Sequence, residues 1–367
     1  MAGGVGERFW PLSRQARPKQ LLNLDDPRRC LLLEAVERLV PLIPPERILV
    51  VTGKALLEPI RAAQVGVPDK NVLAEPLKRN TAGCLAYAAA VAATRFGDPE
   101  KITMAVVTAD HRIGPPARFR ATLETALGAA ETRNALVTIG VRPARPEPGY
   151  GYIEVAESAE RNTSPASAAG SETAAQVLPV LQFREKPDRA TAETFLRTGR
   201  FYWNSGMFFW KLGTFLSEMR TASPPIHQAI EDMIQALADG NALALERLFA
   251  GLPDISIDCA LLEKAKHRLV VVSDLIWDDI GAWDALARTF PPDAAGNVAI
   301  GDPILVDSSD CIVYNDPGAA KMAVGVVGMQ DVAVIVTGDA VLVVPKQRAQ
   351  DVKEIVKALK ARHAPQL

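Results

Sequence analysis

The first twenty residues combine residue types that suit the binding of phosphate groups. Glycines at positions 3, 4 and 6 free the backbone to take positive φ and to turn successive N–H groups toward an anion. Four cations follow in the same short loop, Arg8, Arg14, Arg17 and Lys19. Fixed donors together with mobile cations suit a triphosphate whose charge shifts during a reaction. A glycine turn followed by solvated basic residues is the simpler interpretation, and glycine content alone does not decide between the two.

Two familiar phosphate-binding motifs fail to match this loop. A P-loop needs Lys followed by Ser or Thr, and the dinucleotide fingerprint needs a third glycine where Phe9 stands. The stretch instead resembles the signature of the sugar-1-phosphate nucleotidylyltransferases, A-G-G-x-G-x-R-x-x-P-L-S-R-x-x-P-K. Its form with Trp10 and Gln20, W-P-L-S-R followed by P-K-Q, is similar to the mannose-1-phosphate guanylyltransferase branch of that family.

Composition limits the class of protein. A chain of 367 residues with 48% hydrophobic and 23% charged residues can bury a large core. A net charge of −2 argues against a general nucleic-acid binder. The four cysteines, at positions 30, 84, 259 and 311, have no C-x-x-C spacing, so neither a disulfide framework nor a zinc site is indicated. Because there is no apolar run of membrane-spanning length and no signal-peptide pattern, we expect a cytoplasmic protein with no membrane partner.

Apolar patterning predicts strands alternating with helices through the first 140 residues. The expected strands are 47–52, 71–74, 102–108 and 135–140, and the expected helices are 31–39, 55–64, 81–96 and 118–132. Such alternation is typical of right-handed βαβ units, so we expect an α/β fold with a Rossmann-like, mostly parallel sheet flanked by helices. Ligands of such sheets bind at the carboxyl ends of strands, which singles out the loops after 71–74 and 102–108.

The loop after the second strand reads Glu75-Pro76-Leu77-Lys78-Arg79-Asn80-Thr81-Ala82. A helix N-cap within a polar loop explains it on physical grounds alone. It also resembles the family's guanine-recognising loop, E-P-x-x-R-N-T-A, with Lys78 where the family usually has Gly. That resemblance implies nucleotide-binding roles for Glu75, Arg79, Asn80 and Thr81. A carboxylate at Glu75 would accept from guanine N1–H and the exocyclic amine, a donor pair that adenine lacks.

The loop after the third strand carries Asp110, the first charged residue after an apolar run. A carboxylate there suits Mg²⁺, which takes one or two carboxylates together with phosphate oxygens, although a capping role is the alternative. Ala-Asp-His resembles the family's P-A-D-H metal motif, and residues 277–283 resemble its W-x-D-I-G-S-W. The resemblance implies Asp110 and Asp279 as Mg²⁺ ligands. We expect His111 to be structural, because attack by a phosphate oxygen requires no base.

The next stretch resembles the sugar-binding half of the family. Three motifs, G-Y-G-Y-I from 149, F-x-E-K-P from 183 and W-N-S-G-x-F from 203, occur in the family's order, although each alone could be a turn with an aromatic core contact. The resemblance implies sugar-phosphate binding by Gly151, Glu185, Lys186 and Asn204. Residues 256–264 match its S-I-D-x-x-x-x-E-K stretch, in which Asp258 could equally be an N-cap. The polar segment 158–174 is expected to be a mobile connection between two strands.

Beyond residue 291 the pattern changes to short alternating strands separated by Gly, Asp and Asn, followed by an amphipathic helix over 347–361. We expect a small β domain, and the family's short β-helical C-terminal unit fits it. The expected domains are therefore a nucleotidyltransferase domain over 1–290 and a β domain over 291–367. The first would hold a nucleotide half, about 1–148, and a sugar-phosphate half, about 149–290.

The resemblance implies transfer of GMP from GTP to mannose 1-phosphate, giving GDP-mannose and pyrophosphate. It assigns phosphate binding to Ala2, Gly3, Gly4 and Gly6, and charge neutralisation to Arg8 and Lys19, with Asp110 as the third catalytic residue. Another acceptor, such as a heptose phosphate, is one alternative. A non-catalytic regulatory paralogue that binds GDP-mannose is another, although retention of the charged residues argues against it. A homodimer is one possible assembly.

The phosphate loop of a βαβ fold normally follows a central strand, and Met1 stands where the family has the last residue of that strand. A strand needs about five residues. The expectation is therefore that the natural start of this chain lies upstream of Met1.

Overall fold

The computed structural model describes residues 1–4, 6–24, 28–156, 175–316 and 322–367. They separate into two compact units that combine distant segments of the chain. The first unit comprises Met1, Glu75–Thr108 and Ile113–Trp277, and the second comprises Ala2–Ala74, Ala109–Arg112 and Asp278–Leu367. Within the described ranges, no helix is both long and apolar enough to cross a membrane. The connection expected at 158–174 lies outside the described residues.

A six-stranded sheet forms the centre of the first unit, in the order β3-β8-β5-β9-β7-β6. Its longest strand is β8 (Phe201–Lys211), whose aromatic residues are mostly buried. The other strands are β3 (Thr103–Val106), β5 (Leu136–Val141), β6 (Tyr152–Val155), β7 (Gln176–Arg184) and β9 (Arg268–Ser273). The W-N-S-G motif therefore lies on a central strand, where its alternate side chains reach both faces of the sheet.

The α/β class with helices around a sheet is confirmed, but the expected mostly parallel pairing is wrong for this sheet. β8 runs antiparallel to β3, β5 and β6, and β7 runs antiparallel to β6 and β9. Only β5 and β9 pair in parallel among its described strands. The physical reason is that an apolar run indicates a buried strand but does not indicate whether that strand runs parallel or antiparallel to its neighbours. β8 returns between β3 and β5 and reverses the pairing on both sides.

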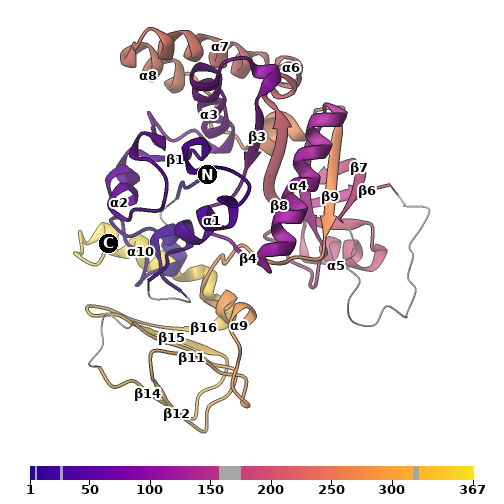
Figure 1. Ribbon diagram of the computed structural model, residues 1–367. Helices are drawn as coiled ribbons and strands as arrows, with labels where there is room; N and C mark the ends of the chain where they lie inside the picture. The colour runs from indigo at the N-terminus through magenta and orange to yellow at the C-terminus, as the bar shows by residue number, and fades with distance from the viewer. Residues whose placement is uncertain (5, 25–27, 157–174, 317–321) are drawn as a thin grey trace. The chain divides into compact units, whose positions relative to one another are not determined.

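Helices of the first unit cover this sheet and its edge (Figure 1). The long helix α4 (Pro116–Arg133) packs against β5 and β8, and α3 (Asn80–Phe96) packs against α7. Alanines fill much of α3, so neighbouring helices can approach its backbone closely. The remaining helices are α5 (Arg189–Thr198), α6 (Leu212–Ala222), α7 (Pro224–Ala238) and α8 (Ala242–Ala250).

The N-terminal part of the second unit holds the glycine loop beside a two-stranded sheet of β1 (Val50–Gly53) and β2 (Val72–Glu75). Helices α1 (Leu31–Leu39) and α2 (Leu57–Ala62) accompany these strands. The expected helix over 31–39 is confirmed at both ends. β4 (Arg112–Gly114) and β10 (Ile276–Asp278) form a further two-stranded sheet.

The C-terminal part of the second unit is built of short stacked strands, as the sequence predicts. β11, β13 and β15 pair in parallel, as do β12 and β14, so successive turns of chain stack as coils. β16 closes the first of these sheets in antiparallel pairing. The elements are β11 (Val298–Ile300), β12 (Ile304–Val306), β13 (Ile312–Asn315), β14 (Gly325–Val327), β15 (Val332–Val336), β16 (Val341–Pro345), and helices α9 (Leu286–Thr289) and α10 (Val352–Ala361).

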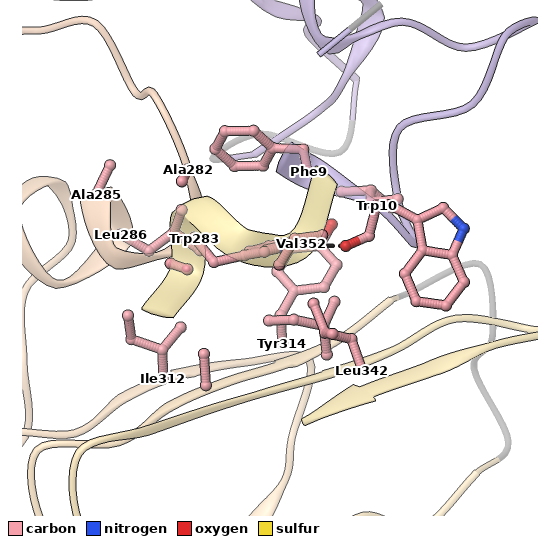
Figure 2. Close-up of a cluster of buried hydrophobic side chains, with 14 of the residues drawn as sticks. Phe9, Trp10, Ala282, Trp283, Ala285, Leu286, Ile312, Tyr314, Leu342 and Val352 are labelled. Atoms are coloured by element: carbon pink, nitrogen blue, oxygen red, sulfur yellow. Dashed lines mark hydrogen bonds between the residues drawn. The ribbon is translucent and has the colours of Figure 1, made fainter. Parts of the chain in front are cut away.

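One apolar cluster joins the glycine loop to these C-terminal elements within the second unit (Figure 2). The Trp283 ring lies 5.0 Å from the Phe9 ring and 5.6 Å from the Tyr314 ring, measured between centroids. Its indole N–H donates to the Trp10 carbonyl over 2.9 Å. Phe9 and Trp10 belong to the signature, yet both side chains are buried in this core. They therefore anchor the loop rather than bind a ligand.

We predict that Trp283→Ala lowers the free energy of unfolding by about 3–5 kcal/mol, because a fully buried indole is replaced by a cavity. Trp283→Phe should cost less, since it keeps most of the ring volume. Urea unfolding of both variants measures the difference. Val341→Ala is the control, because its side chain is 56% exposed. A loss in Trp283→Ala no larger than in this control would contradict the prediction.

Candidate active site

The glycine loop is fixed at its start by β1. The Ala2 N–H donates to the Val51 carbonyl over 2.8 Å, and the Ala2 carbonyl accepts from Thr52 Oγ1 and from Gln20 Nε2, each over 2.8 Å. Gly3 and Gly4 follow as exposed backbone with open space around both, and Gly4 has a φ of 101°. Among the described residues nothing would contact a Cβ at either position, and this open, exposed backbone suits the close approach of a phosphate.

Gly6 brings the loop against Lys19. Its φ is 70°, and a Cβ at this position would lie 2.3 Å from the Cβ of Lys19. The Gly6 carbonyl also accepts from Ser13 Oγ over 2.7 Å. A side chain at position 6 would therefore displace the lysine backbone, so glycine is required here for packing as well as for conformation.

Lys19 joins two acidic residues of the second unit. Its Nζ lies 3.0 Å from Asp110 Oδ2 and donates to the Asp279 backbone carbonyl over 2.6 Å, although 91 and 260 residues separate them in sequence. The Lys19 side chain is buried. Burial alone would raise the pKa of Asp110, but Lys19 and His111 outweigh it and hold that pKa below its usual value. Asp110 is thus a carboxylate at neutral pH.

His111 lies beside Asp110, with its Nε2 3.9 Å from Asp110 Oδ1. Burial lowers the pKa of His111 below 6.5, against the opposing charge of Asp110, so the ring is neutral at pH 7. Its backbone carbonyl accepts from Arg38 Nη2 over 3.2 Å, which ties the loop to α1.

The donor set around Lys19 fits a hard divalent cation. The Asp110 carboxylate and the Asp279 carbonyl already hold a cation, the lysine ammonium, and both offer oxygen, the ligand type that Mg²⁺ prefers. Across the described residues, no group of three or more His, Cys, Asp and Glu side chains has the arrangement of a full metal cage. One or two carboxylates completed by phosphate oxygens would supply this chemistry without such a cage.

Arg8 is exposed and lies against the C-terminal segment of the same unit. Its Nη1 donates to Gln350 Oε1 over 2.6 Å, and its neighbour Glu7 pairs with Lys360 on α10. Arg14 pairs in the same way with Asp339 over 2.6 Å. The C-terminal elements therefore hold the charged side of the signature loop, and Arg8 must exchange Gln350 for a phosphate to act in catalysis.

Glu75 ends β2 and is only 9% exposed. Its Oε1 is fully buried and has no hydrogen-bond partner among the described residues. Burial raises the pKa of Glu75 to about 7, with the N-terminal ammonium and Lys78 acting in the opposite direction. A buried acceptor without a partner is costly in a folded protein, and such groups concentrate at sites that a ligand completes.

We predict that Glu75→Gln raises stability at high pH but not at low pH. The folded protein holds the Glu75 proton up to about pH 7, whereas an ordinary glutamate releases it near 4.5. Stability of the wild-type chain is therefore lost as pH rises between these values, by up to about 3 kcal/mol. Gln has no proton to lose, so the stability of Glu75→Gln relative to wild type should increase between pH 5 and pH 8. Unfolding by urea at both pH values checks this, and an unchanged difference would contradict it.

The other residues of the predicted base loop make structural contacts. Arg79 Nη2 donates to the Ala250 carbonyl over 2.8 Å, and Thr81 Oγ1 accepts from the Ile257 N–H over 2.8 Å. Asn80 begins α3 with a φ of 54°, and its Oδ1 accepts from the Thr81 N–H. They tie the start of α3 to the end of α8 and to the segment after it, and so fix the loop that carries Glu75.

The four predicted sugar-phosphate residues lie together in the first unit. A Cβ on Gly151 would lie 2.9 Å from Glu185 Oε2 and 3.4 Å from the Asn204 Cβ, and the Gly151 carbonyl accepts from the Asn204 N–H over 2.8 Å. Lys186 turns its Nζ to Glu185 Oε1 over 3.1 Å, and both side chains are exposed. A side chain at position 151 would press on both polar neighbours, so glycine keeps this surface open.

Asp258 also contacts these residues. The sequence alone leaves open whether Asp258 belongs to the site or caps a helix. Its Oδ1 accepts from Asn204 Nδ2 over 2.9 Å, while Asn204 Oδ1 accepts from Thr138 Oγ1 over 3.3 Å. Asp258 is the first residue of a short π-helix, Asp258–Leu262, whose N-cap position is Ile257 and has no side-chain cap bond. Burial, and then the charge of Glu185, raises the pKa of Asp258 to about 6. The match to the family's S-I-D stretch was the signal that could have placed Asp258 in the site.

Comparison with known proteins gives the class of this chain. Residues 1–295 match the family described as nucleotidyl transferase, and residues 301–359 match the MannoseP isomerase/GMP-like beta-helix domain. The chain belongs to the nucleotidyl transferase family, and its stacked C-terminal strands are that β-helix domain. The resemblance to the sugar-1-phosphate nucleotidylyltransferases is confirmed.

Named relatives match over nearly the whole chain. A mannose-1-phosphate guanylyltransferase of Klebsiella pneumoniae is 36% identical over 98% of this chain and 73% of its own length. The xanthan biosynthesis protein XanB of Xanthomonas campestris is 36% identical over 98% of this chain and 72% of its own length. A solved structure from Thermus thermophilus, described as a mannose-1-phosphate geranyltransferase, is 38% identical over 98% of both chains, with a TM-score of 0.83.

Proposed function

We propose that the chain transfers GMP from GTP to mannose 1-phosphate, giving GDP-mannose and pyrophosphate. The observation that carries the proposal is the convergence of Lys19, Asp110 and Asp279 beside a glycine loop in a nucleotidyl transferase. The names of the near full-length relatives support the choice of mannose 1-phosphate and of a guanylyl group.

In the proposed reaction an oxygen of the sugar phosphate attacks the α-phosphorus of GTP in line. The new P–O bond forms as the bond to pyrophosphate breaks, and no proton has to be removed from the nucleophile. N–H groups of Gly3, Gly4 and Gly6 bind phosphate oxygens, and Arg8 and Lys19 neutralise the charge that develops on pyrophosphate.

Asp110 and Asp279 are the residues that would hold Mg²⁺, which supplies electrostatic stabilisation of the phosphate oxygens when bound. Glu75 accepts from the guanine edge, supported by Arg79, Asn80 and Thr81, which fix its loop. Gly151, Glu185 and Asn204 bind the sugar hydroxyls, Lys186 neutralises the sugar phosphate, and Asp258 orients the Asn204 amide. Positioning and electrostatics thus supply most of the rate enhancement.

The proposal includes a nucleotidyltransferase domain over 1–290 and a β domain over 291–367. It also includes a cytoplasmic location, and a homodimer as the assembly to test.

A steady-state assay decides the function. Purified chain is supplied with GTP or ATP and a panel of sugar 1-phosphates, including mannose and heptose phosphates, and pyrophosphate release is measured. If the chain prefers a heptose phosphate, that sugar phosphate takes the place of mannose 1-phosphate as the proposed acceptor. Binding of GDP-mannose without pyrophosphate release on any pair would instead favour a regulatory role.

A further inference from the structure

The surroundings of the buried Glu75 carboxyl group allow both its protonated and its ionised form. Two titratable side chains of α3, the Cys84 thiol and the Tyr87 hydroxyl, interact with it electrostatically, and neither supplies a positive charge. Its Oε1 lacks a partner among the described residues, so no hydrogen bond holds the group in one state. The proton on Glu75 is thus free to respond to a ligand.

Few other charges act on this carboxyl group. The Met1 ammonium, which donates to the Val107 carbonyl over 2.8 Å, and Lys78 both favour the ionised form, while burial favours the neutral form more strongly. Burial raises the pKa of Cys84 to about 12, and it raises the pKa of Tyr87 as well, so both stay neutral near pH 7. Among Glu75, Cys84 and Tyr87, Glu75 is therefore the group that changes charge near neutral pH, with its own pKa at about 7.

The two protonation states of a carboxyl group match two different purines. An ionised carboxylate offers two acceptors, which match the N1–H and exocyclic N–H donors of guanine. A protonated carboxyl group offers one donor and one acceptor, which match the N1 acceptor and the exocyclic amine of adenine. A buried polar group that is left unpaired discriminates strongly against the wrong partner.

We propose that Glu75 selects the purine by the proton it carries, taking guanine when ionised and adenine when protonated. The inference rests on the proposed function, in which Glu75 reads the base. Since guanine binds one state and adenine the other, the ratio of apparent affinities follows the ratio of ionised to protonated Glu75. That ratio changes about tenfold for each pH unit, so preference for GTP over ATP should rise up to about 100-fold from pH 6 to pH 8.

The test measures kcat/KM for GTP and for ATP with mannose 1-phosphate across this pH range. The triphosphate chain is common to both nucleotides, so its own titration cancels in the ratio. Glu75→Gln is the matched variant, because its amide has one donor and one acceptor at every pH. In the wild-type chain we expect the GTP/ATP ratio of kcat/KM to rise with pH. In Glu75→Gln the same ratio should not change with pH and should equal the value that the wild-type chain has at low pH.

A second variant tests the electrostatic cause. Lys78 stabilises the ionised form of Glu75, so Lys78→Met should move the change in the ratio to higher pH without removing it. An N-terminally acetylated chain controls for titration of Met1, and it should keep the rise but move it to higher pH, as Lys78→Met does, because the Met1 ammonium also favours ionised Glu75. A flat ratio in the wild-type chain overturns the inference. So does a rise that persists in Glu75→Gln or vanishes on acetylation, because another group would then be responsible.

Binding measurements keep this inference separate from the proposed function. Dissociation constants of non-hydrolysable GTP and ATP analogues, measured over the same pH range, should give the same change in ratio without turnover. If no GDP-mannose forms at any pH but the binding ratio still rises, the proposed function fails and the role of Glu75 stands. If GDP-mannose forms but the binding ratio is flat in the wild-type chain, the role of Glu75 fails and the proposed function stands.

Discussion

Asp110→Asn and Asp279→Asn are each expected to lower turnover by about 10²-fold or more while the fold is kept. Each change removes a negative charge and preserves nearly the same shape. A metal ion at these residues would stabilise the transition state by several kcal/mol, and each 1.36 kcal/mol corresponds to about tenfold in rate. Asp110 is the stronger case, because its low pKa makes it a carboxylate throughout the neutral range.

The measurement is kcat for GDP-mannose synthesis at saturating Mg²⁺, with thermal unfolding as the check on folding. Asp331→Asn is the matched control, since Asp331 pairs with Lys346 over 3.0 Å in the same unit, as Asp110 pairs with Lys19 over 3.0 Å. The control should keep its turnover. Near wild-type turnover in Asp110→Asn or in Asp279→Asn would remove that residue from the proposed metal site.

Helix positions followed well from the sequence because they depend on local patterns. The spacing of apolar residues over 31–39 predicts α1 to the residue, and Asn80–Phe96 begins one residue before the predicted helix. The sequence also predicts the short C-terminal strands, since each short apolar run is bounded by turn residues. Both patterns depend on near neighbours in the chain.

Strand direction could not be predicted, because it depends on which strand lies beside which. β8 pairs with β3, which lies about 100 residues earlier in the chain. It also pairs with β5 and β6. Nothing in the apolar pattern of Phe201–Lys211 specifies these neighbours. The rule that parallel sheets follow alternating strands and helices applies only while consecutive strands remain neighbours.

In the candidate site, too, some features follow from local sequence and others depend on distant contacts. Glu75 and Asp110 were predicted from their places after strands, but the bond between Asn204 and Asp258 joins residues 54 positions apart and needed the structure. The signature also contains residues of different kinds. Phe9 and Trp10 pack in the core, whereas Lys19 contacts the acidic residues. Sequence similarity alone does not separate anchoring residues from binding residues.

Lys19→Met is expected to lower turnover by about 10²–10³-fold, the cost of removing one preorganised donor to developing charge. Methionine keeps an unbranched chain of similar length, so the packing against Gly6 is retained. Arginine should not restore activity. Its planar guanidinium is larger than an ammonium and cannot reproduce the contacts with Asp110 Oδ2 at 3.0 Å and the Asp279 carbonyl at 2.6 Å.

A second measurement separates this role from a general loss of structure. The Lys19 ammonium neutralises Asp110, so its removal should tighten binding of Mn²⁺ to the nucleotide-free chain even as turnover falls. Isothermal titration with Mn²⁺ measures this, and Lys346→Met is the control, because it breaks an ion pair of the same 3.0 Å length with Asp331. Unchanged turnover in Lys19→Met would exclude Lys19 from catalysis. Lost turnover with weaker Mn²⁺ binding would mean instead that Lys19 supports the shape of the site, because removal of a competing cation can only strengthen a metal site that stays intact.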